Sequence, residues 1–299
     1  MNNIIVYIQQ YAQSMTTVEK RIASVILDDP QEAIEMKIVD VAKRSATSAG
    51  SVTRFCQRLG LSGYAEFKLE LAKDVFLSKN QGLNVNLQSN PFIDIRESLE
   101  VSEVIQNVMT TVGRSLDLLN RLTNPEHIEL AVQKIKNAKK VFIAGIGASG
   151  LVALDLYQKL LRLGISATYN VEIHLQVVTA CTLSKGDLAY IISYSGETPE
   201  IISIAKEAKK QGASIIGVSR VGNTSLLKLA DLALYVPDTE NICRNGAFIS
   251  RLNQMMINDM IFYALLSQYY EQYQQTIDKT WQGVSAIAPK VSARANNKG

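Results

Sequence analysis

The segment Ile191-Ile-Ser-Tyr-Ser-Gly-Glu-Thr198 leads from an apolar run into hydroxyl side chains, a glycine and the start of a helix. Residues 189–192 have the composition of a buried parallel strand, while Thr198 and Pro199 are typical of an N-cap and a first helical residue. A helix N-terminus presents unpaired N–H groups and a partial positive charge, so it attracts an anion without help from Lys or Arg. The segment therefore predicts a phosphate-binding loop, although an ordinary strand-to-helix loop with a capping threonine fits it equally well.

A second loop of the same kind lies at residues 141–150, where the apolar strand Val-Phe-Ile-Ala ends in Gly-Ile-Gly-Ala-Ser-Gly before a helical pattern. The spacing of its three glycines also satisfies the G-x-G-x-x-G pattern of dinucleotide-binding loops, and Glu172 follows the next expected strand, as that alternative requires. A dinucleotide site does not explain the hydroxyl groups at 193–198. Two serine-bearing loops at neighbouring strand ends suit one compact phosphate that carries a sugar.

Together the loops Gly145-x-Gly-x-Ser149 and Ser193-x-Ser-Gly-x-Thr198 resemble those of the sugar isomerase (SIS) domain family, in which such loops bind the phosphate of phosphosugars. The resemblance implies a phosphosugar ligand and no cofactor. For Glu197 a helix-capping role is an equal alternative, and Tyr194 is expected to contribute its backbone N–H. The expected phosphosugar-binding residues are Gly147, Ser149, His174, Ser193, Tyr194, Ser195, Glu197 and Thr198.

The 299 residues have a composition that suits a globular protein with a sizeable core, since 47% are hydrophobic and 20% are charged. No apolar stretch is long enough to span a membrane, and the start of the sequence lacks the basic region and cleavage site of a signal peptide, so a cytoplasmic location is expected. Cys56, Cys181 and Cys243 have neither disulfide nor metal spacing, and His127 and His174 are the only histidines. The composition therefore argues against a metal site and against a Ser-His-Asp hydrolase.

Residues 1–77 are expected to form an all-helical unit. Residues 38–44 have the pattern of one helix, small hydroxyl residues break it at 45–48, and a second helix then continues to Leu59 and stops at Gly60. A helix, a short turn and a second helix with hydroxyl residues at its start form the helix-turn-helix pattern of DNA-binding domains. The sequence therefore predicts a DNA-binding unit at this end of the chain.

Basic and hydroxyl side chains cluster in the helix-turn-helix segment, although the chain as a whole carries a net charge of only +3. Clustered cations attract the DNA backbone, and hydroxyl groups donate to phosphates or base edges. An ordinary solvated surface is the alternative interpretation of such a cluster. The residues expected to contact double-stranded DNA are Lys43, Thr47, Ser48, Ser51, Thr53, Arg54, Gln57, Arg58 and Lys68.

The motif Val41-Ala-Lys, followed by Ser48 and by Val52-x-Arg-Phe-Cys-x-x-Leu-Gly-x-x-Gly-Tyr-x-x-Phe-Lys68, resembles the N-terminal domain of the RpiR-type transcriptional regulators, which join this domain to a SIS domain. The two resemblances together cover most of the chain. Two residues depart from the usual pattern. Ala46 stands in the turn where such motifs often have Gly, and Gly50 lies in the second helix, where it costs about 1 kcal/mol relative to Ala.

The rest of the chain begins with a polar stretch rich in Asn and Gln, residues 78–97, that predicts a linker. Beyond a helix expected at 99–122, strand and helix patterns alternate, which predicts an α/β domain with a five-stranded parallel sheet covered on both faces. The expected domains are 1–77 for the helix-turn-helix, 98–270 for the SIS domain with its leading helix, and 271–299 for a tail with a short helix and a frayed end. The expected strands are 140–145, 165–169, 188–193, 214–219 and 232–237, and the expected helices are 128–137, 149–163, 171–180, 198–211, 224–230 and 247–269.

The resemblances imply a DNA-binding regulator of carbohydrate metabolism, amino sugars included, whose affinity for DNA changes when a phosphosugar binds. A homodimer or homotetramer joined through the SIS domains would place two DNA-binding units on a palindromic site. The alternative is a phosphosugar isomerase or lyase with a helical appendage, for which Glu172, His174 and Glu197 are the available proton carriers. Either Arg244 or Arg251 could reach a ligand or a neighbouring subunit, and an ion-pair role for Arg251 is equally open.

Overall fold

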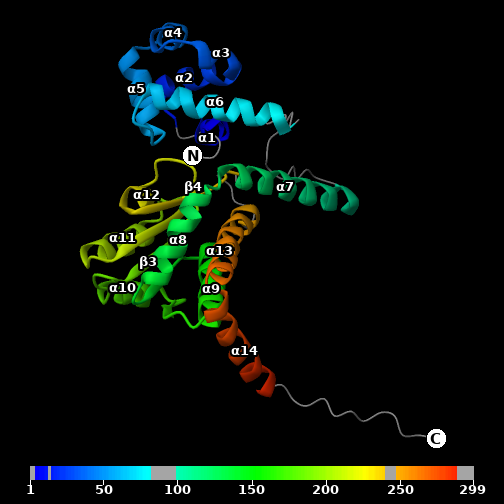
Figure 1. Ribbon diagram of the computed structural model, residues 1–299, viewed down its shortest axis with the longest axis vertical. Coiled ribbons are helices and arrows are strands. Elements are labelled where there is room, and N and C mark those ends of the chain that lie inside the picture. Colours follow the sequence, from blue (N-terminus) through cyan, green and yellow to red (C-terminus); the bar gives the residue numbers. More distant parts are fainter. Residues whose placement is uncertain (1–3, 13–14, 82–98, 240–246, 288–299) are drawn as a thin grey trace, which may run out of the picture.

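The computed structural model of the chain describes residues 4–12, 15–81, 99–239 and 247–287. Within these residues, six helices form an N-terminal part, which we call the head, and a parallel sheet with its covering helices forms a second part, which we call the body (Figure 1). The last helix extends from the end of the body that lies opposite the head (Figure 1).

The head is built from short helices around one apolar core that includes Ile22, Phe55 and Phe67. Capping sets several helix boundaries; for example, the side chains of Thr16 and Glu19 form a capping box at the start of the second helix. The helices of the head are α1 (Ile4–Tyr11), α2 (Thr17–Asp28), α3 (Pro30–Glu35), α4 (Ile38–Arg44), α5 (Ala49–Arg58) and α6 (Tyr64–Gln81).

The body alternates strands and helices after a long leading helix. Its helices are α7 (Val101–Leu122), α8 (Pro125–Asn137), α9 (Ala148–Arg162), α10 (Ile173–Cys181), α11 (Pro199–Lys210), α12 (Ser225–Leu229), α13 (Phe248–Gln268) and α14 (Tyr270–Ile287). Its strands are β1 (Val141–Ala144), β2 (Ala167–Thr168), β3 (Leu188–Ile192), β4 (Ser214–Arg220) and β5 (Leu232–Val236).

The five strands are parallel and lie in the order β2-β1-β3-β4-β5. Helices α8, α9 and α13 cover one face of this sheet, and α10, α11 and α12 cover the other. Strands β1 and β3 are neighbours, with Val141 opposite Leu188 and Ala144 opposite Ile191. The chain runs from β1 outward to β2 and then returns to the other side of β1, so the loops after β1 and β3 flank the point at which ligands bind in such sheets.

The structure confirms the predicted fold class, an all-helical N-terminal region followed by an α/β domain with a five-stranded parallel sheet. Helix α4 has the predicted bounds, whereas β2 has two residues in place of the expected five. Helix α6 continues to Gln81, into the stretch predicted as a linker. The C-terminal helix α14 has 18 residues and is longer than expected, because Tyr273 and Ile277 pack against the core of the body. The exact domain boundaries stay a prediction.

The head and the body share an apolar contact. The rings of Tyr7 in α1 and Tyr235 in β5 meet edge to face with their centroids 5.6 Å apart. Leu118 and Leu122 of α7 and Val221 after β4 belong to the apolar core of the head. Burial of these groups holds α1 against the body. In the part of the chain that the structure describes, no helix combines the length and apolarity needed to cross a bilayer.

Candidate functional site

The loop after β3 gathers three hydroxyl groups at the N-terminus of α11. The Oγ atom of Ser193 lies 3.2 Å from the Oγ1 atom of Thr198, and the Oγ atom of Ser195 lies 3.4 Å from it. Thr198 is the N-cap residue and Pro199 follows it, as predicted, but the Thr198 side chain makes no capping hydrogen bond. The first N–H groups of α11 thus stay without the usual side-chain cap beside three hydroxyl groups, which is an arrangement suited to an anion.

Gly196 fixes the path of this loop. Its φ angle of +63° lies in the left-handed region, where a side chain is strained. A Cβ atom at this position would lie 2.3 Å from Oγ1 of Thr224 and 2.6 Å from Oγ of Ser219. The carbonyl oxygen of Gly196 also accepts a hydrogen bond from the N–H of Leu226 in α12. The loop therefore packs against the start of α12 at a distance that only glycine permits.

The loop after β1 is packed equally closely. A Cβ atom on Gly145 would lie 2.5 Å from the carbonyl oxygen of Ser149. The buried side chain of Gln176 accepts from the N–H of Gly145 at 3.2 Å and donates to its carbonyl oxygen at 3.0 Å. The Ser149 hydroxyl donates to Oε1 of Gln254 in α13 at 3.3 Å. Because β1 and β3 are paired, Ser149 and Ser193 lie at the same edge of the sheet, as the sequence predicted.

Gly147 is the N-cap residue of α9, with a φ angle of +59° and no heavy atom within 4 Å of the position that a Cβ atom would take. The backbone there is thus open toward the edge of the sheet. Arg251 lies half-buried in the first turn of α13, and Arg244 lies outside the described residues. The roles expected for these two arginines stay predictions.

Two residues predicted for the phosphosugar site point elsewhere in the single chain. Both carboxylate oxygens of Glu197 accept hydrogen bonds from Ser225, from its N–H at 2.8 Å and from its hydroxyl at 2.6 Å. Glu197 thus has a structural role at the start of α12 and does not cap α11, the helix that follows it. The side chain of His174 is 90% exposed on α10. Glu172 caps α10 by accepting from the N–H groups of His174 and Leu175, and the N–H of His174 lowers the pKa of this carboxyl. The carboxylate that a dinucleotide site would need is thus already engaged.

Tyr194 lies between the two serines, but its side chain is buried in a different network. Its hydroxyl donates to Oδ1 of Asp238 at 3.1 Å and accepts from the N–H of Thr239 at 3.0 Å. Oδ2 of Asp238 accepts from Nη1 of Arg220 at 2.7 Å. The backbone N–H of Asp238 donates to Oε1 of Gln10 in α1 at 2.9 Å. Hydrogen bonds therefore connect the loop after β3 to the first helix of the head.

Helices α4 and α5 form the predicted helix-turn-helix. Helix α4 ends in a Schellman motif, in which the N–H of Thr47 donates to the carbonyl oxygen of Ala42 at 2.8 Å and that of Ala46 to Lys43 at 3.2 Å. Ala46 occupies the left-handed position of this motif with a φ angle of +50°. Helix α5 ends in the same motif with Gly60 at the corresponding position, where φ is +86°. The turn thus has the geometry that Gly usually supplies, with Ala in its place.

The start of α5 is exposed and polar. The Oγ atom of Ser48 caps the helix by accepting from the N–H of Ser51 at 3.2 Å, and it lies 3.0 Å from the Ser51 hydroxyl. The exposed guanidinium of Arg54 donates to that hydroxyl at 3.3 Å. A Cβ atom on Gly50 would meet only Oγ of Ser48, at 3.8 Å. Hydroxyl groups and a cation therefore lie together at a helix N-terminus that faces solvent.

The remaining residues predicted to contact DNA differ in how strongly other groups hold them. Nη1 of Arg58 forms a 2.6 Å ion pair with Glu19. Burial alone would raise the pKa of Glu19, but hydrogen bonds from Thr16 and Arg58 lower it overall. The hydroxyl of Thr53 donates to the carbonyl oxygen of Ala49 at 3.1 Å. Lys43 and Gln57 are exposed, and Thr47 and Lys68 are half-buried.

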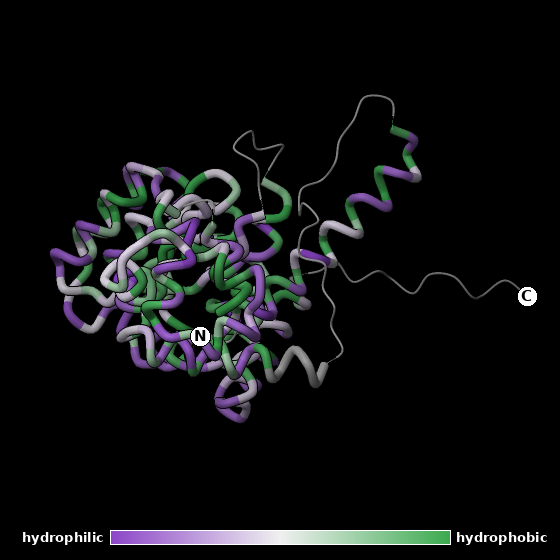
Figure 2. The backbone as a smooth tube through the Cα atoms, turned by 90° about the horizontal axis from the view of Figure 1, so that it is seen from above, coloured by the Kyte–Doolittle hydropathy of each residue, from purple (hydrophilic) through white to green (hydrophobic). Residues whose placement is uncertain are grey.

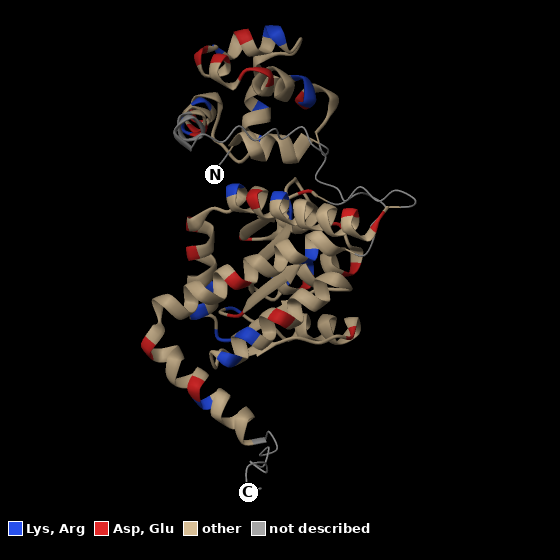
Figure 3. Ribbon diagram, turned by 90° about the vertical axis from the view of Figure 1, so that its right-hand side faces the viewer, with Lys and Arg blue, Asp and Glu red and all other residues tan. Residues whose placement is uncertain are grey.

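Acidic and basic residues both occur along the helices of the head (Figure 3). Where charges of both signs are close together, DNA binding depends on individual contacts more than on a strong overall field. In the part of the chain that the structure describes, no three His, Cys, Asp or Glu side chains gather in a group that could hold a metal ion.

Comparison with known proteins matches both parts of the chain. Residues 2–78 match the family model for the helix-turn-helix domain of the rpiR family, and residues 134–264 match that for the SIS domain. An HTH-type transcriptional regulator of Caldanaerobacter subterraneus is 32% identical over 281 residues, which cover 94% of this chain and 96% of the relative. The HTH-type transcriptional regulator HexR of Pseudomonas aeruginosa is 30% identical over 261 residues, which cover 87% of this chain and 88% of HexR.

Among solved structures, the NanR protein of Vibrio vulnificus complexed with ManNAc-6P is similar with a TM-score of 0.59. The match has 24% sequence identity and covers 96% of this chain and all of the NanR chain, so it shows a shared fold over both parts. The two relatives named above are transcriptional regulators, and the match covers 96% and 88% of their lengths. This chain therefore belongs to the RpiR family of helix-turn-helix transcriptional regulators with a phosphosugar-binding SIS domain, and it is a regulator rather than an enzyme.

Proposed function

We propose that a phosphosugar bound between the loops after β1 and β3 changes the affinity of the head for operator DNA. The observation that carries this proposal is the hydroxyl cluster of Ser193, Ser195 and Thr198 at the N-terminus of α11, within a loop whose Tyr194 is hydrogen-bonded toward the head. A phosphomonoester carries between one and two negative charges near neutral pH, and its terminal oxygens are mainly acceptors. Hydroxyl donors and the N–H groups of a helix N-terminus satisfy such an anion.

The route from this site to the head runs through Tyr194, Asp238 and Gln10. A phosphate drawn into the loop changes the positions of Ser193 and Ser195, and Tyr194 between them moves with the backbone. Asp238 responds because it accepts from the Tyr194 hydroxyl, and its N–H contacts Gln10 of α1. The shift in DNA affinity cannot exceed the difference in phosphosugar affinity between the two arrangements of the head.

On the DNA side, α5 is the recognition helix of the proposal. Ser48, Ser51 and Arg54 contact phosphates or base edges, with Lys43 and Gln57 exposed beside them. Arg58 reaches DNA only if its ion pair with Glu19 opens. Operator binding places the protein in the cytoplasm.

A homodimer or homotetramer completes the proposal, because two heads are needed to read the two halves of a palindromic site. The N-terminal half of α7 projects from the body with apolar and polar residues along it (Figure 2). Val101, Val104, Ile105 and Met109 on this half are between 43% and 74% exposed. Exposed large apolar side chains at helical spacing support association with a second copy of the chain.

The bound ManNAc-6P of NanR supports an amino sugar phosphate as effector. An isomerase would need a base beside the sugar. The exposed His174 and the Glu197 carboxylate that is bonded to Ser225 do not supply one within this chain. The positions of these two side chains therefore favour a sensor, that is, a regulator that binds the phosphosugar without converting it.

The test is fluorescence anisotropy on DNA from upstream of the regulator's own gene and neighbouring genes, at fixed salt because phosphate contacts depend strongly on salt. Hexose phosphates, N-acetylamino sugar phosphates and their unphosphorylated parents are each added. The proposal requires that one phosphorylated sugar shifts the binding curve while its parent sugar does not. Conversion of a sugar phosphate into product, with no specific DNA binding, would reject it.

Substitution of Gln10 tests the route. Gln10→Met should leave the affinity for DNA alone and the affinity for phosphosugar alone near those of the wild type. It should remove most of the change in DNA affinity that the phosphosugar causes. Gln9→Met is the matched control, because Oε1 of Gln9 has no hydrogen-bond partner among the described residues. An unchanged shift in Gln10→Met would remove this contact from the mechanism and leave the sensor function standing.

A further inference from the structure

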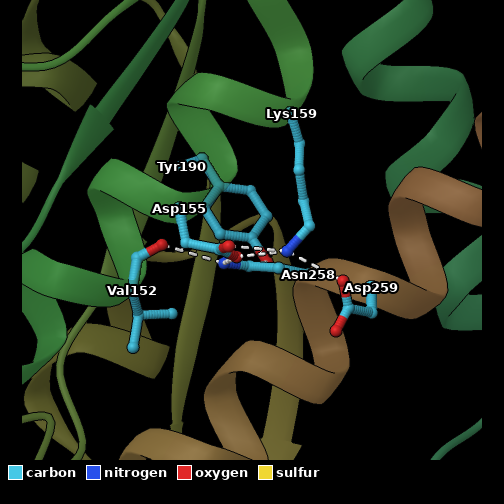
Figure 4. Close-up of polar contacts among 6 residues, drawn as sticks. All are labelled: Val152, Asp155, Lys159, Tyr190, Asn258 and Asp259. Atoms are coloured by element: carbon cyan, nitrogen blue, oxygen red, sulfur yellow. Dashed lines mark hydrogen bonds and ion pairs between the residues drawn. The ribbon is translucent and has the colours of Figure 1, made fainter. Parts of the chain in front are cut away.

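Two buried amide side chains lie one turn apart on α13, and they differ in how completely they are paired. Asn258 is fully buried and uses both ends of its amide (Figure 4). Its Nδ2 donates to the carbonyl oxygen of Val152 at 2.9 Å and approaches Oδ2 of Asp155 at 3.4 Å. Its Oδ1 accepts from the hydroxyl of Tyr190 at 3.2 Å. Beside this amide, Lys159 forms ion pairs with Asp155 and with Asp259 of α13 (Figure 4). Asn258 thus holds α9, β3 and α13 together.

Gln254 is buried as deeply but is only half paired. It is 1% exposed, and its Oε1 accepts from the Ser149 hydroxyl at 3.3 Å. Its Nε2 has no hydrogen-bond partner among the described residues. Buried N–H groups are nearly always paired, and an unpaired one calls for a specific explanation. The partner that Gln254 does have is a residue of the proposed phosphate site.

The count of protons at Ser149 supplies that explanation. A serine hydroxyl has one proton and two lone pairs, whereas a phosphate dianion only accepts. In the structure the Ser149 proton points to Gln254. When Ser149 donates to phosphate instead, Oε1 of Gln254 loses its donor. Rotation of the terminal amide through half a turn, about a soft torsion, brings Nε2 to the lone pairs of the Ser149 oxygen. The unpaired N–H then finds an acceptor, and the carbonyl left behind is tolerated more readily than an unpaired N–H.

We propose that Gln254 is a positioning residue of the phosphosugar site, which turns its amide to release the Ser149 proton to the phosphate and donates to the same oxygen in return. This inference rests on the proposed function, because it takes a phosphate at these loops as given. Gln254 acts through Ser149 and does not touch the ligand. The amide of Gln254 thus has two orientations. Without phosphate its Oε1 accepts from the Ser149 hydroxyl, and with phosphate bound its Nε2 donates to the Ser149 oxygen.

Gln254→Glu is the discriminating variant, because a carboxylate has the shape of the amide but can only accept. It holds the Ser149 proton and repels the anion, so affinity for phosphate should fall about 100-fold near pH 8. At lower pH the buried carboxyl takes up a proton and can donate to Ser149, so the ratio of variant to wild-type dissociation constants should shrink to about 10 near pH 5.5. Any effect of the phosphate's own ionisation on such a ratio is read from Gln254→Met, which carries no charge. Gln254→Met, with neither donor nor acceptor, should weaken binding about 5-fold at every pH.

The measurement is calorimetry with inorganic phosphate and with the hexose and N-acetylhexosamine phosphates of the panel. Gln272→Glu is the control, since it makes the same exchange at an exposed residue of α14 whose Oε1 accepts from Lys136, and it should leave the ratio near one. Operator binding without sugar and near-ultraviolet circular dichroism report whether each variant is folded.

Equal phosphate affinity for wild type and Gln254→Glu near pH 8, or a ratio that does not change with pH, would overturn the inference while the site itself stands. If Gln254→Glu fails to fold, Gln254→Met decides, and wild-type affinity in that variant overturns it. If the wild-type protein binds neither inorganic phosphate nor any sugar phosphate, the proposed function fails and the inference fails with it.

Discussion

Two helix N-termini in this chain gather hydroxyl groups, and they are built in different ways. At α5, Ser48 caps the helix itself and the exposed Arg54 adds a cation. At α11, Thr198 leaves its helix without a side-chain cap, and the Ser193 side chain beside it is 3% exposed. The α5 site is exposed and charged, whereas the α11 site is buried or half-buried and built from neutral donors.

The difference matches two kinds of phosphate. A polyanion such as DNA stays hydrated, so an exposed site with cations binds it mainly through charge, and the affinity falls as salt rises. The phosphomonoester proposed for the α11 site gives up part of its water on entering a half-buried site, so hydrogen-bond geometry decides the affinity. The comparison therefore predicts that changes of shape harm the α11 site most, whereas removal of charge harms the α5 site.

Gly196→Ala should have the largest effect. The added Cβ atom overlaps Thr224 at a backbone angle that alanine strains to adopt, so phosphosugar affinity should fall by about 100-fold or more. DNA binding without sugar should persist. Gly212→Ala is the matched control, because its φ is +81° but its nearest neighbour would lie 3.9 Å away. Titration of the sugar phosphate by calorimetry compares the two variants. An equal loss of phosphosugar affinity in both would show that a strained backbone angle, and not the overlap with Thr224, lowers the affinity.

Ser195→Ala removes one neutral donor from the α11 site. Loss of a hydrogen bond to a charged ligand should weaken phosphosugar binding by about 1 to 3 kcal/mol, or roughly 5- to 150-fold. Ser184→Ala is its control, because Ser184 pairs with Asp187 before β3, at the other end of the sheet. A dissociation constant unaltered by Ser195→Ala would argue against the site.

Arg54→Ala removes the cation from the α5 site. DNA affinity should fall about 5- to 10-fold, and the slope of its logarithm against the logarithm of salt concentration should drop by about 1, while phosphosugar affinity is unchanged. Arg44→Ala should cost less, because its guanidinium is already paired with both carboxylate oxygens of Glu32. Anisotropy over a series of salt concentrations gives both quantities, and an unchanged slope would remove Arg54 from the interface.

Ala46→Gly should have the smallest effect, and it should be stabilising. Relief of the left-handed strain at the end of α4 should raise the free energy of unfolding of the head by about 1 kcal/mol, less the extra entropy of glycine when unfolded. Gly60→Ala makes the reverse change in the matching motif of α5 and should destabilise by a similar amount. Urea unfolding followed by circular dichroism gives both values. A loss of stability in Ala46→Gly would mean that another contact compensates for the strain.

The sequence predicted most of the fold because local patterns carry it. The apolar run at 189–192 and the glycine spacing after β1 mark strands and loops within a few residues, and Thr198 with Pro199 marks the start of α11. Strand β2 is shorter than its apolar pattern suggests, since it pairs only with β1 at the edge of the sheet. Local pattern also did not reveal the length of α14, which depends on contacts with the body.

The candidate site was predicted less completely. Ser149, Ser193, Ser195 and Thr198 lie at one edge because the sheet topology follows from the alternation of strands and helices. The buried polar groups that support them were missed. Gln176, Asp238 and Gln254 form hydrogen bonds to partners 31, 44 and 105 residues away. A single polar residue on a helix or in a loop has no periodicity that reveals such a partner.

The alanine in the turn of the helix-turn-helix also has a genetic consequence. Every alanine codon becomes a glycine codon through one change at its second base. The relaxed form of this turn is therefore a single nucleotide away from the natural gene, in keeping with proteins that sit below their stability optimum. Selection of a randomly mutated gene for regulation at raised temperature should recover that base change repeatedly at codon 46.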